Sequence, residues 1–175
     1  MNGDKVSSGK LSVINTKGTL DCAYPTFILA STAAALGMEV SIFFTFYGVN
    51  LLLKDTSVLK ITPTAAPDMP MKMPFGPKWL QKIDFGPKVP NVLWNIPFMD
   101  SIATTLMKKT IANCGVATID ELRDLCQEAE VKFLACQMTV ELFGYDHSQF
   151  IDGVDYVGAA TYFEESSDAT QSLFI

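Results

Sequence analysis

Short apolar runs of strand length alternate with longer segments of helical character along most of the chain. Residues 39–46 are rich in β-branched and aromatic side chains and show almost no alternation of polar and apolar positions, which is typical of a strand buried on both faces of a parallel sheet. Similar runs predict further strands at residues 11–15, 131–135, 154–156 and 173–175. The alternation predicts a single α/β domain over residues 1–175, with a mainly parallel five-stranded sheet flanked by helices.

Proline and glycine indicate where the helices begin and end. Pro25 is expected in the first turn of a helix that runs to about Leu36, because its missing N–H group has no partner to lose there. Gly37 is suited to the left-handed conformation that ends such a helix. Gly144 is expected to end the helix that follows Cys136 in the same way.

The segment 60–97 differs from the rest because it holds eight of the nine prolines and a methionine-rich patch. So many prolines are incompatible with regular secondary structure, and loops of this length are normally functional or flexible. We therefore interpret the segment as a Pro/Met-rich insertion within the domain. Two alternatives stay open: a mobile insertion, and an arm whose Met, Trp and Phe side chains cover a neighbouring subunit or a pocket.

The composition narrows the classes of partner. Hydrophobic residues make up 49% of the chain and charged residues 18%, so much of the surface must be covered, in part by other subunits of a homo-oligomer. The net charge of −6 argues against nucleic acid, which requires clustered Lys and Arg. An uncharged run of 17 residues between Asp21 and Glu39 is shorter than the roughly 20 that span a bilayer, so no membrane segment is expected. The polar start lacks the apolar run of a signal peptide, which favours a cytoplasmic protein with free thiols.

One cysteine lies where chemistry is expected. Cys136 follows an apolar strand directly and precedes the helical run 137–143, and ligands of open α/β sheets gather beyond the carboxyl ends of the strands. The free N–H groups of a helix start, here including those of Gln137 and Met138, favour a thiolate, which is the nucleophilic form of cysteine. The same position also suits a small buried side chain that only fills the end of a strand.

The other cysteines and the first loop give weaker indications. Cys126 falls on the apolar stripe of a helix and is expected in the core. Cys22 is a candidate second thiol, because the first loop opens near the same edge of the sheet as Cys136. Gly18 and Thr19 lie in that loop, which could support a small anion.

Metals and cofactors are not indicated. The chain has no C-x-x-C motif, and its one histidine, His147, lies in a polar turn that favours a solvated side chain over a metal ligand. Gly18 stands alone in the first loop, so neither a dinucleotide-binding motif nor a P-loop is present. We therefore predict no metal site and no organic cofactor.

Several segments, taken in order, resemble the DsrE/DsrF/DsrH-like proteins. The likeness is to a subgroup with a long Pro/Met-rich insertion, whose members are described as sulfurtransferases or as a peroxiredoxin family. The segments that carry it are TKGTLD at 16–21, AAALGMEV at 33–40, FFTFYG at 43–48, the run 131–144 with ACQM at 135–138, and the ending from 152 to 175.

This resemblance implies a flavodoxin-like or Rossmann-like sheet, assembly into dimers, trimers or hexamers, and sulfur carried as a persulfide on a cysteine. Cys136 matches the cysteine of the subgroup. The implied partners are sulfur donor and acceptor proteins or small sulfur anions, and the implied role is a sulfur carrier or a sulfurtransferase. Two alternatives are kept: a non-catalytic oligomeric binding or assembly module, and a thiol redox protein that uses Cys136 with Cys22.

Overall fold

The computed structural model describes residues 9–61, 77, 82 and 99–175. Its strands are β1 (Lys10–Asn15), β2 (Glu39–Phe44), β3 (Lys132–Cys136), β4 (Val154–Val157) and β5 (Gln171–Phe174). Its α-helices are α1 (Leu20–Ala35), α2 (Met99–Asn113), α3 (Ile119–Glu128), α4 (Gln137–Phe143) and α5 (Ala159–Glu165). The 3₁₀ helices among the described residues are η1 (Phe46–Leu52), η2 (Thr56–Val58) and η7 (His147–Gln149).

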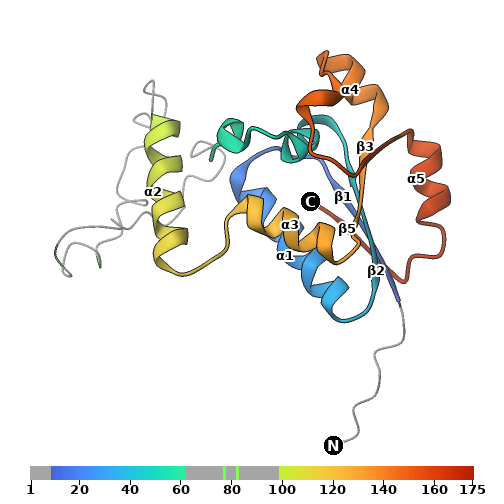
Figure 1. Ribbon diagram of the computed structural model, residues 1–175, viewed down its shortest axis with the longest axis horizontal. Helices are drawn as coiled ribbons and strands as arrows, with labels where there is room; N and C mark the ends of the chain where they lie inside the picture. The colour runs from blue at the N-terminus through green and yellow to red at the C-terminus, as the bar shows by residue number, and fades with distance from the viewer. Residues whose placement is uncertain (1–8, 62–76, 78–81, 83–98) are drawn as a thin grey trace, which may run out of the picture. The chain divides into compact units, whose positions relative to one another are not determined.

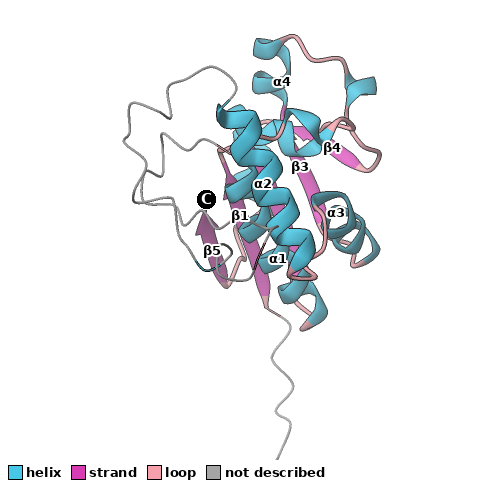
Figure 2. Ribbon diagram, turned by 90° about the vertical axis from the view of Figure 1, so that its left-hand side faces the viewer, coloured by secondary structure: helices cyan, strands magenta, loops and turns pink. Residues whose placement is uncertain are grey.

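The five strands form one parallel sheet in the order β4-β3-β2-β1-β5, which confirms the predicted fold class. Helices α1 and α3 lie together on one face (Figures 1 and 2). Helix α5 lies on the other face, where the chain returns from β4 to β5 (Figure 1). The strand order reverses direction after β4, so right-handed crossovers require the last helix to lie opposite α1. Because the five strands are parallel, their carboxyl ends lie at the same edge of the sheet, and α4 lies beyond that edge.

An aromatic cluster fills the space between the sheet and α1. The ring centroid of Phe27 on α1 lies 6.1 Å from that of Phe44 on β2 and 6.0 Å from that of Phe133 on β3. All three side chains are fully buried. Edge-to-face and tilted contacts at these distances are favourable for aromatic pairs, so this cluster holds α1 against the central strands.

A second cluster lies under α5, on the other face. Tyr162 of α5 stacks on Phe43 of β2 with ring centroids 4.6 Å apart, and its hydroxyl is 2.7 Å from the Ser12 hydroxyl in the centre of the sheet. Leu134 and Cys136 of β3 complete this buried cluster. Strand side chains alternate between the two faces of a sheet. Leu134 and Cys136 therefore point toward α5, whereas Phe133 points to the opposite face, toward α1.

The first helix begins earlier than expected. Pro25 was predicted in its first turn, but α1 starts at Leu20 and Pro25 lies inside it. Proline there removes the N–H group that would bond to the carbonyl of Asp21, and the packing of Phe27 on the sheet compensates for that loss. The predicted helix ends are confirmed, since Gly37 has φ +82 and Gly144 has φ +68.

The chain divides into two compact units, residues 1–59 with 119–175, and residues 60–118. The first unit contains the sheet. Among the described residues of the second unit, α2 carries Thr104, whose hydroxyl accepts a hydrogen bond of 2.9 Å from the Ile61 N–H group. Most of the predicted insertion at 60–97 lies outside the described residues. Within the described ranges, no helix has the length and apolar character that crossing a membrane requires.

Candidate functional site

The site is built around Cys136, which is both the last residue of β3 and the residue that precedes the first turn of α4. Its side chain is 5% exposed and packs with Phe43, Leu134 and Tyr162. One side of the sulfur is therefore apolar. The other side faces the start of α4 and the loop that follows β2.

The polar groups around Cys136 lower the pKa of its thiol. Burial alone raises the pKa of this thiol, but hydrogen bonds from the Thr139 hydroxyl, the Thr139 N–H group, the Thr45 hydroxyl and the Met138 N–H group outweigh it. The pKa of Cys136 consequently lies below the ordinary value of 9.0. Hydrogen bonds to the anionic form have this effect because they stabilise the thiolate more than the thiol.

Thr139 connects the sulfur to the loop after β2. Its hydroxyl oxygen accepts a hydrogen bond of 3.2 Å from the Phe46 N–H group and lies 3.4 Å from the Thr45 hydroxyl. Thr139 is itself 1% exposed. Its hydroxyl group is thus enclosed among the sulfur, Thr45 and the backbone of Phe46.

The loops after β1, β2 and β3 contact one another at this edge. The ring of Tyr47 in η1 stacks on Phe143 of α4 with centroids 5.6 Å apart. Gly18 approaches the Tyr47 carbonyl so closely that a β-carbon has no room, and Gly48 approaches Asn15 in the same way. The turn after β2 is therefore fixed from two sides.

The structure places the predicted support residues unequally. A role of the Met138 and Gln137 N–H groups in supporting the thiolate stays a prediction; the Gln137 side chain donates a hydrogen bond of 2.6 Å to Glu141 on the surface of α4. Gly18 contacts η1, and Thr19 precedes α1 without making a side-chain cap hydrogen bond. An anion-supporting role for Gly18 and Thr19 stays a prediction.

Sequence reasoning missed the two threonines that contact the sulfur. Thr139 lies three residues after Cys136, on the first turn of the same helix, and this spacing was the available signal. Thr45 directly follows β2, so its place beside β3 depends on the pairing of the two strands. Nothing in the local sequence distinguishes it from other polar residues after strands.

The other cysteines have different surroundings. Cys126 is fully buried on α3, and burial raises the pKa of its thiol to about 12, which confirms it as a core residue. Cys22 is half-buried in the first turn of α1, with its sulfur 3.8 Å from a carboxylate oxygen of Asp21. Cys22 thus lies on the helix that covers the face opposite to Cys136.

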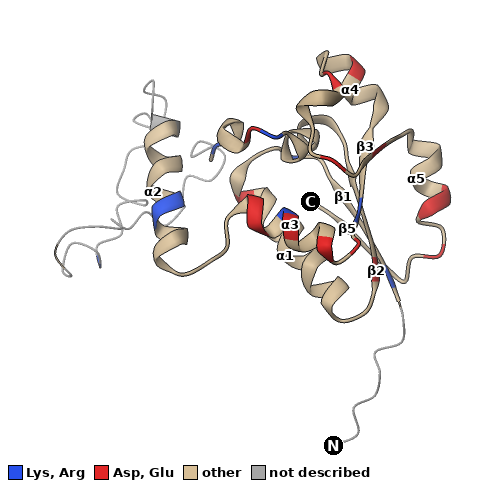
Figure 3. Cartoon of the chain, viewed as in Figure 1, with Lys and Arg blue, Asp and Glu red and all other residues tan. Residues whose placement is uncertain are grey.

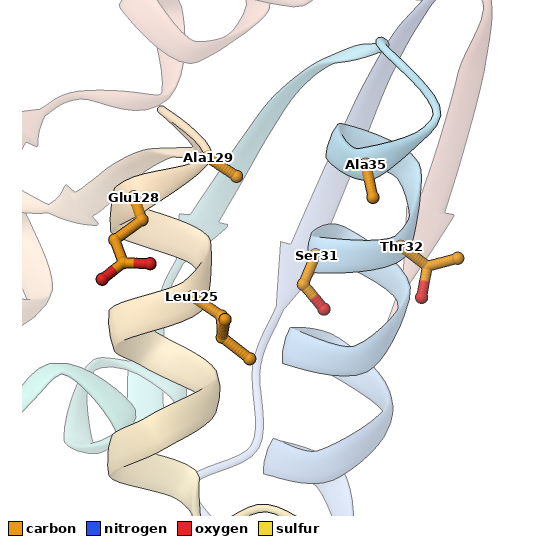
Figure 4. A pocket seen from close by; sticks show the side chains of 6 residues that line it. All are labelled: Ser31, Thr32, Ala35, Leu125, Glu128 and Ala129. Atoms are coloured by element: carbon orange, nitrogen blue, oxygen red, sulfur yellow. The ribbon is translucent and has the colours of Figure 1, made fainter.

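A groove lies far from this edge. It has a volume of about 510 Å³ and runs between the carboxyl-terminal halves of α1 and α3 (Figure 4). Its lining residues are Ser31, Thr32, Ala35, Leu125, Glu128 and Ala129. Because these helices run antiparallel to the strands, the groove lies toward the edge where the strands begin. Among the described residues, no group of three or more His, Cys, Asp and Glu side chains is arranged to hold a metal.

Comparison with known proteins identifies the family. A model of the DsrE/DsrF/DrsH-like family matches residues 7–174. The chain belongs to this family. The family resemblance read from the sequence is thereby confirmed.

Two family relatives align along nearly their whole length. The chain is 51% identical over 166 residues to "Sulfur carrier protein DsrE2" of Allochromatium vinosum, covering 95% of this chain and 98% of that protein. It is 30% identical over 168 residues to "Uncharacterized protein YrkE" of Bacillus subtilis, covering 95% and 96%. The crystal structure of the ychN protein from E. coli aligns with a TM-score of 0.47 at 9% identity, over 95% of this chain and 99% of that one.

Proposed function

We propose that this protein is a sulfur carrier that holds sulfane sulfur as a persulfide on Cys136. The observation that carries the proposal is the position of Cys136 at the junction of β3 and α4, where its surroundings lower the pKa of the thiol although it is buried. The name of the relative with 51% identity, a sulfur carrier, supports the same role. Cytoplasmic location and assembly into a homo-oligomer remain predictions of the sequence.

Sulfur transfer by this residue needs no oxidant. The Cys136 thiolate attacks the outer sulfur of a donor persulfide, R–S–SH, and forms a new S–S bond. The S–S bond of the donor breaks, and its inner sulfur leaves as a thiolate with the electron pair. In the second step an acceptor thiolate attacks the outer sulfur on Cys136, takes it as a new persulfide and releases the Cys136 thiolate.

The donors around the sulfur suit both steps. They stabilise the Cys136 thiolate as the attacking group in the first step and as the leaving group in the second. The positions of Met138 and Thr139 are fixed because both belong to the first turn of α4, which directly follows β3.

The direct test is mass spectrometry of the full chain after incubation with a persulfide donor and removal of the excess. We expect an adduct of about 32 Da, the mass of one sulfur atom, which reducing agent removes and which is absent in Cys136→Ser. Cys22→Ser is the matched control, because it removes a more exposed thiol and should leave the adduct unchanged. A chain that takes up no sulfur, or a Cys136→Ser variant that still takes it up, would refute the proposal.

The burial of Cys136 favours a second candidate, an assembly module in which this side chain only packs. The two functions differ in thiol chemistry. A packing residue without anion stabilisation titrates at or above the ordinary pKa of a cysteine, whereas a carrier titrates below it. The pH dependence of Cys136 alkylation therefore separates them.

A further inference from the structure

Cys136 is covered, although a sulfur carrier must meet its donor and its acceptor at this residue. The side chain is 5% exposed and belongs to the buried cluster on the face of the sheet where α5 lies. Attack on the S–S bond of a donor requires contact between the thiolate and the outer sulfur of that bond. So enclosed a side chain leaves little room for a second sulfur and the group that carries it. Part of the cover therefore has to move before sulfur is transferred.

Helix α5 is the part of the cover that is held by the fewest buried contacts. Among its seven described residues, Ala159–Glu165, Tyr162 alone is buried. The strand that follows, β5, is exposed at each of its four residues. A helix of this length is not stable by itself in water, so tertiary contacts keep α5 in place. Segments with few buried contacts open at a lower free energy than the core.

Tyr162 is the anchor of this helix. Its ring stacks on Phe43 of β2 with centroids 4.6 Å apart, and both residues belong to the buried cluster that contains Cys136. Its hydroxyl group lies 2.7 Å from the buried Ser12 hydroxyl on β1. Release of this one side chain would therefore uncover the cluster around Cys136, while the strand pairing of β1, β2 and β3 stays intact.

Ion pairs after the anchor add a weaker hold. The Glu165 carboxylate lies 2.6 Å from the Lys132 ammonium group, and the Asp168 carboxylate lies 2.9 Å from that of Lys10. The Asp168 side chain is 72% exposed, and exposed ion pairs contribute little net stability because water and salt screen them. The ring stacking and the buried hydrogen bond of Tyr162 are therefore the main contacts that keep α5 closed.

A groove beside α5 shows that the helix is not tightly packed on the side of β4. The groove has a volume of about 390 Å³, and its lining includes Thr161 and Glu165 of α5 together with Leu134 and Val157 of the sheet. Leu134 is a member of the cluster that contains Cys136, and Val157 packs against that cluster. Open space thus already borders the cover of Cys136.

We propose that α5 is a lid over Cys136, and that release of Tyr162 opens it while the rest of the sheet stays folded. Sulfur is then loaded and unloaded in the open state, and the closed helix shields the loaded sulfur from other thiols. The inference rests on the proposed function of Cys136 for its biological role. Its physical content, the protection of the Cys136 thiol by α5, is measured without sulfur transfer.

The test follows the alkylation of two buried thiols by iodoacetamide in the same chain, each measured from its own peptide by mass spectrometry. Cys126 is fully buried on α3, which covers the opposite face of the sheet, so it reports on unfolding of the core. In rising urea below the unfolding transition, we expect the Cys126 rate to increase steeply and the Cys136 rate to change little. Global unfolding exposes a large surface, whereas opening of α5 exposes a small one. Each thiol is compared with itself, so their different pKa values do not affect the slopes.

Tyr162→Phe keeps the ring and removes the hydroxyl group that bonds to Ser12. At low iodoacetamide concentration, closing is faster than alkylation, and the rate follows the population of the open state. We therefore expect Cys136 alkylation without urea to become at least about fivefold faster, the factor that corresponds to one net hydrogen bond. If this variant fails to fold, Ser12→Ala removes the same hydrogen bond from the side of the sheet and should have the same effect.

Tyr145→Phe is the matched control. It is the same substitution, and it removes a hydroxyl group that donates a hydrogen bond of 2.8 Å to Asn50, outside α5. The Cys136 rate in this variant should stay within about twofold of the wild type, because the contacts of α5 are unchanged.

An unchanged Cys136 rate in folded Tyr162→Phe would overturn the inference, as would an equal increase in Tyr145→Phe or equal urea slopes for Cys126 and Cys136. The persulfide experiment fails or succeeds separately. An adduct on Cys136 in a chain whose two thiols have equal slopes refutes only the lid. A faster Cys136 rate in Tyr162→Phe, in a chain that takes up no sulfur, refutes only the carrier function.

Discussion

Gly48→Ala tests whether the close packing of the loops maintains the site. A β-carbon on Gly48 would lie 2.6 Å from the side-chain oxygen of Asn15 and 2.9 Å from its carbonyl carbon, and closer still to the carbonyl oxygen. The normal separation of such atoms exceeds 3 Å, so η1 or β1 must move by several tenths of an ångström. Asn15 cannot move freely, because its side-chain amide donates a hydrogen bond of 2.7 Å to Thr26 on α1.

We expect the free energy of unfolding to fall by about 1–3 kcal/mol, the usual cost of overpacking a closed interior. The φ of Gly48 is not in the left-handed region, so the loss comes from steric overlap and not from the backbone conformation of alanine. Alanine also reduces the entropy of the unfolded chain, which offsets about 0.4–1 kcal/mol. The movement of η1 should also draw the Phe46 N–H group away from the Thr139 hydroxyl oxygen that accepts its hydrogen bond.

The assay is urea unfolding followed by circular dichroism. Gly158→Ala is the matched control, because a β-carbon at Gly158 meets no atom within 4 Å and the residue has φ −84. Gly158 is also the N-cap residue of α5, where alanine is less favourable than glycine, so this variant should lose about 0.5–1 kcal/mol. Equal stability of the Gly48→Ala and Gly158→Ala variants would show that the contact with Asn15 does not hold the turn in place.

Three further predictions concern the rest of the sheet. Tyr162→Phe removes the partner of the Ser12 hydroxyl and should lower the stability by about 1–3 kcal/mol in urea unfolding; added Ser12→Ala should recover part of that loss. Acidic and basic residues lie near the edge of the sheet where the strands begin (Figure 3). A hydrogen bond from Lys132 lowers the pKa of Glu165 below its ordinary value of 4.5. Its stabilisation is present above that value and is lost as the pH falls through the lowered pKa, so Glu165→Gln should flatten the acid limb of a stability–pH profile. Cys126→Ala should lower the free energy of unfolding by about 1 kcal/mol and leave sulfur uptake intact, because the Cys126 thiol is buried in the core. Reduced sulfur uptake in a folded variant would contradict this assignment.

The sequence predicted the sheet well because its strands are short apolar runs that differ from their surroundings. Strands such as β2 that are buried on both faces of a parallel sheet need no alternation of polar and apolar residues. Glycine adopts the left-handed conformation without a steric clash, so Gly37 and Gly144 mark the helix ends in the sequence. Pro25 was placed wrongly because proline is tolerated beyond the first helical turn when tertiary packing compensates for the lost hydrogen bond. Phe27, whose packing on the sheet provides this compensation, contacts Phe133, which lies more than 100 positions away in the sequence.

The site was predictable only in part. Cys136 stands at the junction of a strand and a helix, and that position is visible in the sequence. The contribution of Thr45 depends on the adjacency of β2 and β3. Phe46 has φ +47, although glycine or asparagine is usual at a positive φ. Local sequence rules fail here because neighbouring loops impose the conformation, and a failure of this kind is itself an indication of a functional site.

The alternation of side chains along β3 bears on the choice between single-thiol and dithiol chemistry. Phe133 contacts Phe27 of α1, so that residue and every second one after it face α1. Cys136 falls in the other set and packs with Tyr162 of α5, while Cys22 belongs to α1 itself. The two thiols thus start from opposite faces of the sheet, and a disulfide requires α-carbons within about 7 Å. A persulfide needs only one cysteine, so the register of β3 favours the sulfur carrier over a redox protein that would pair Cys136 with Cys22.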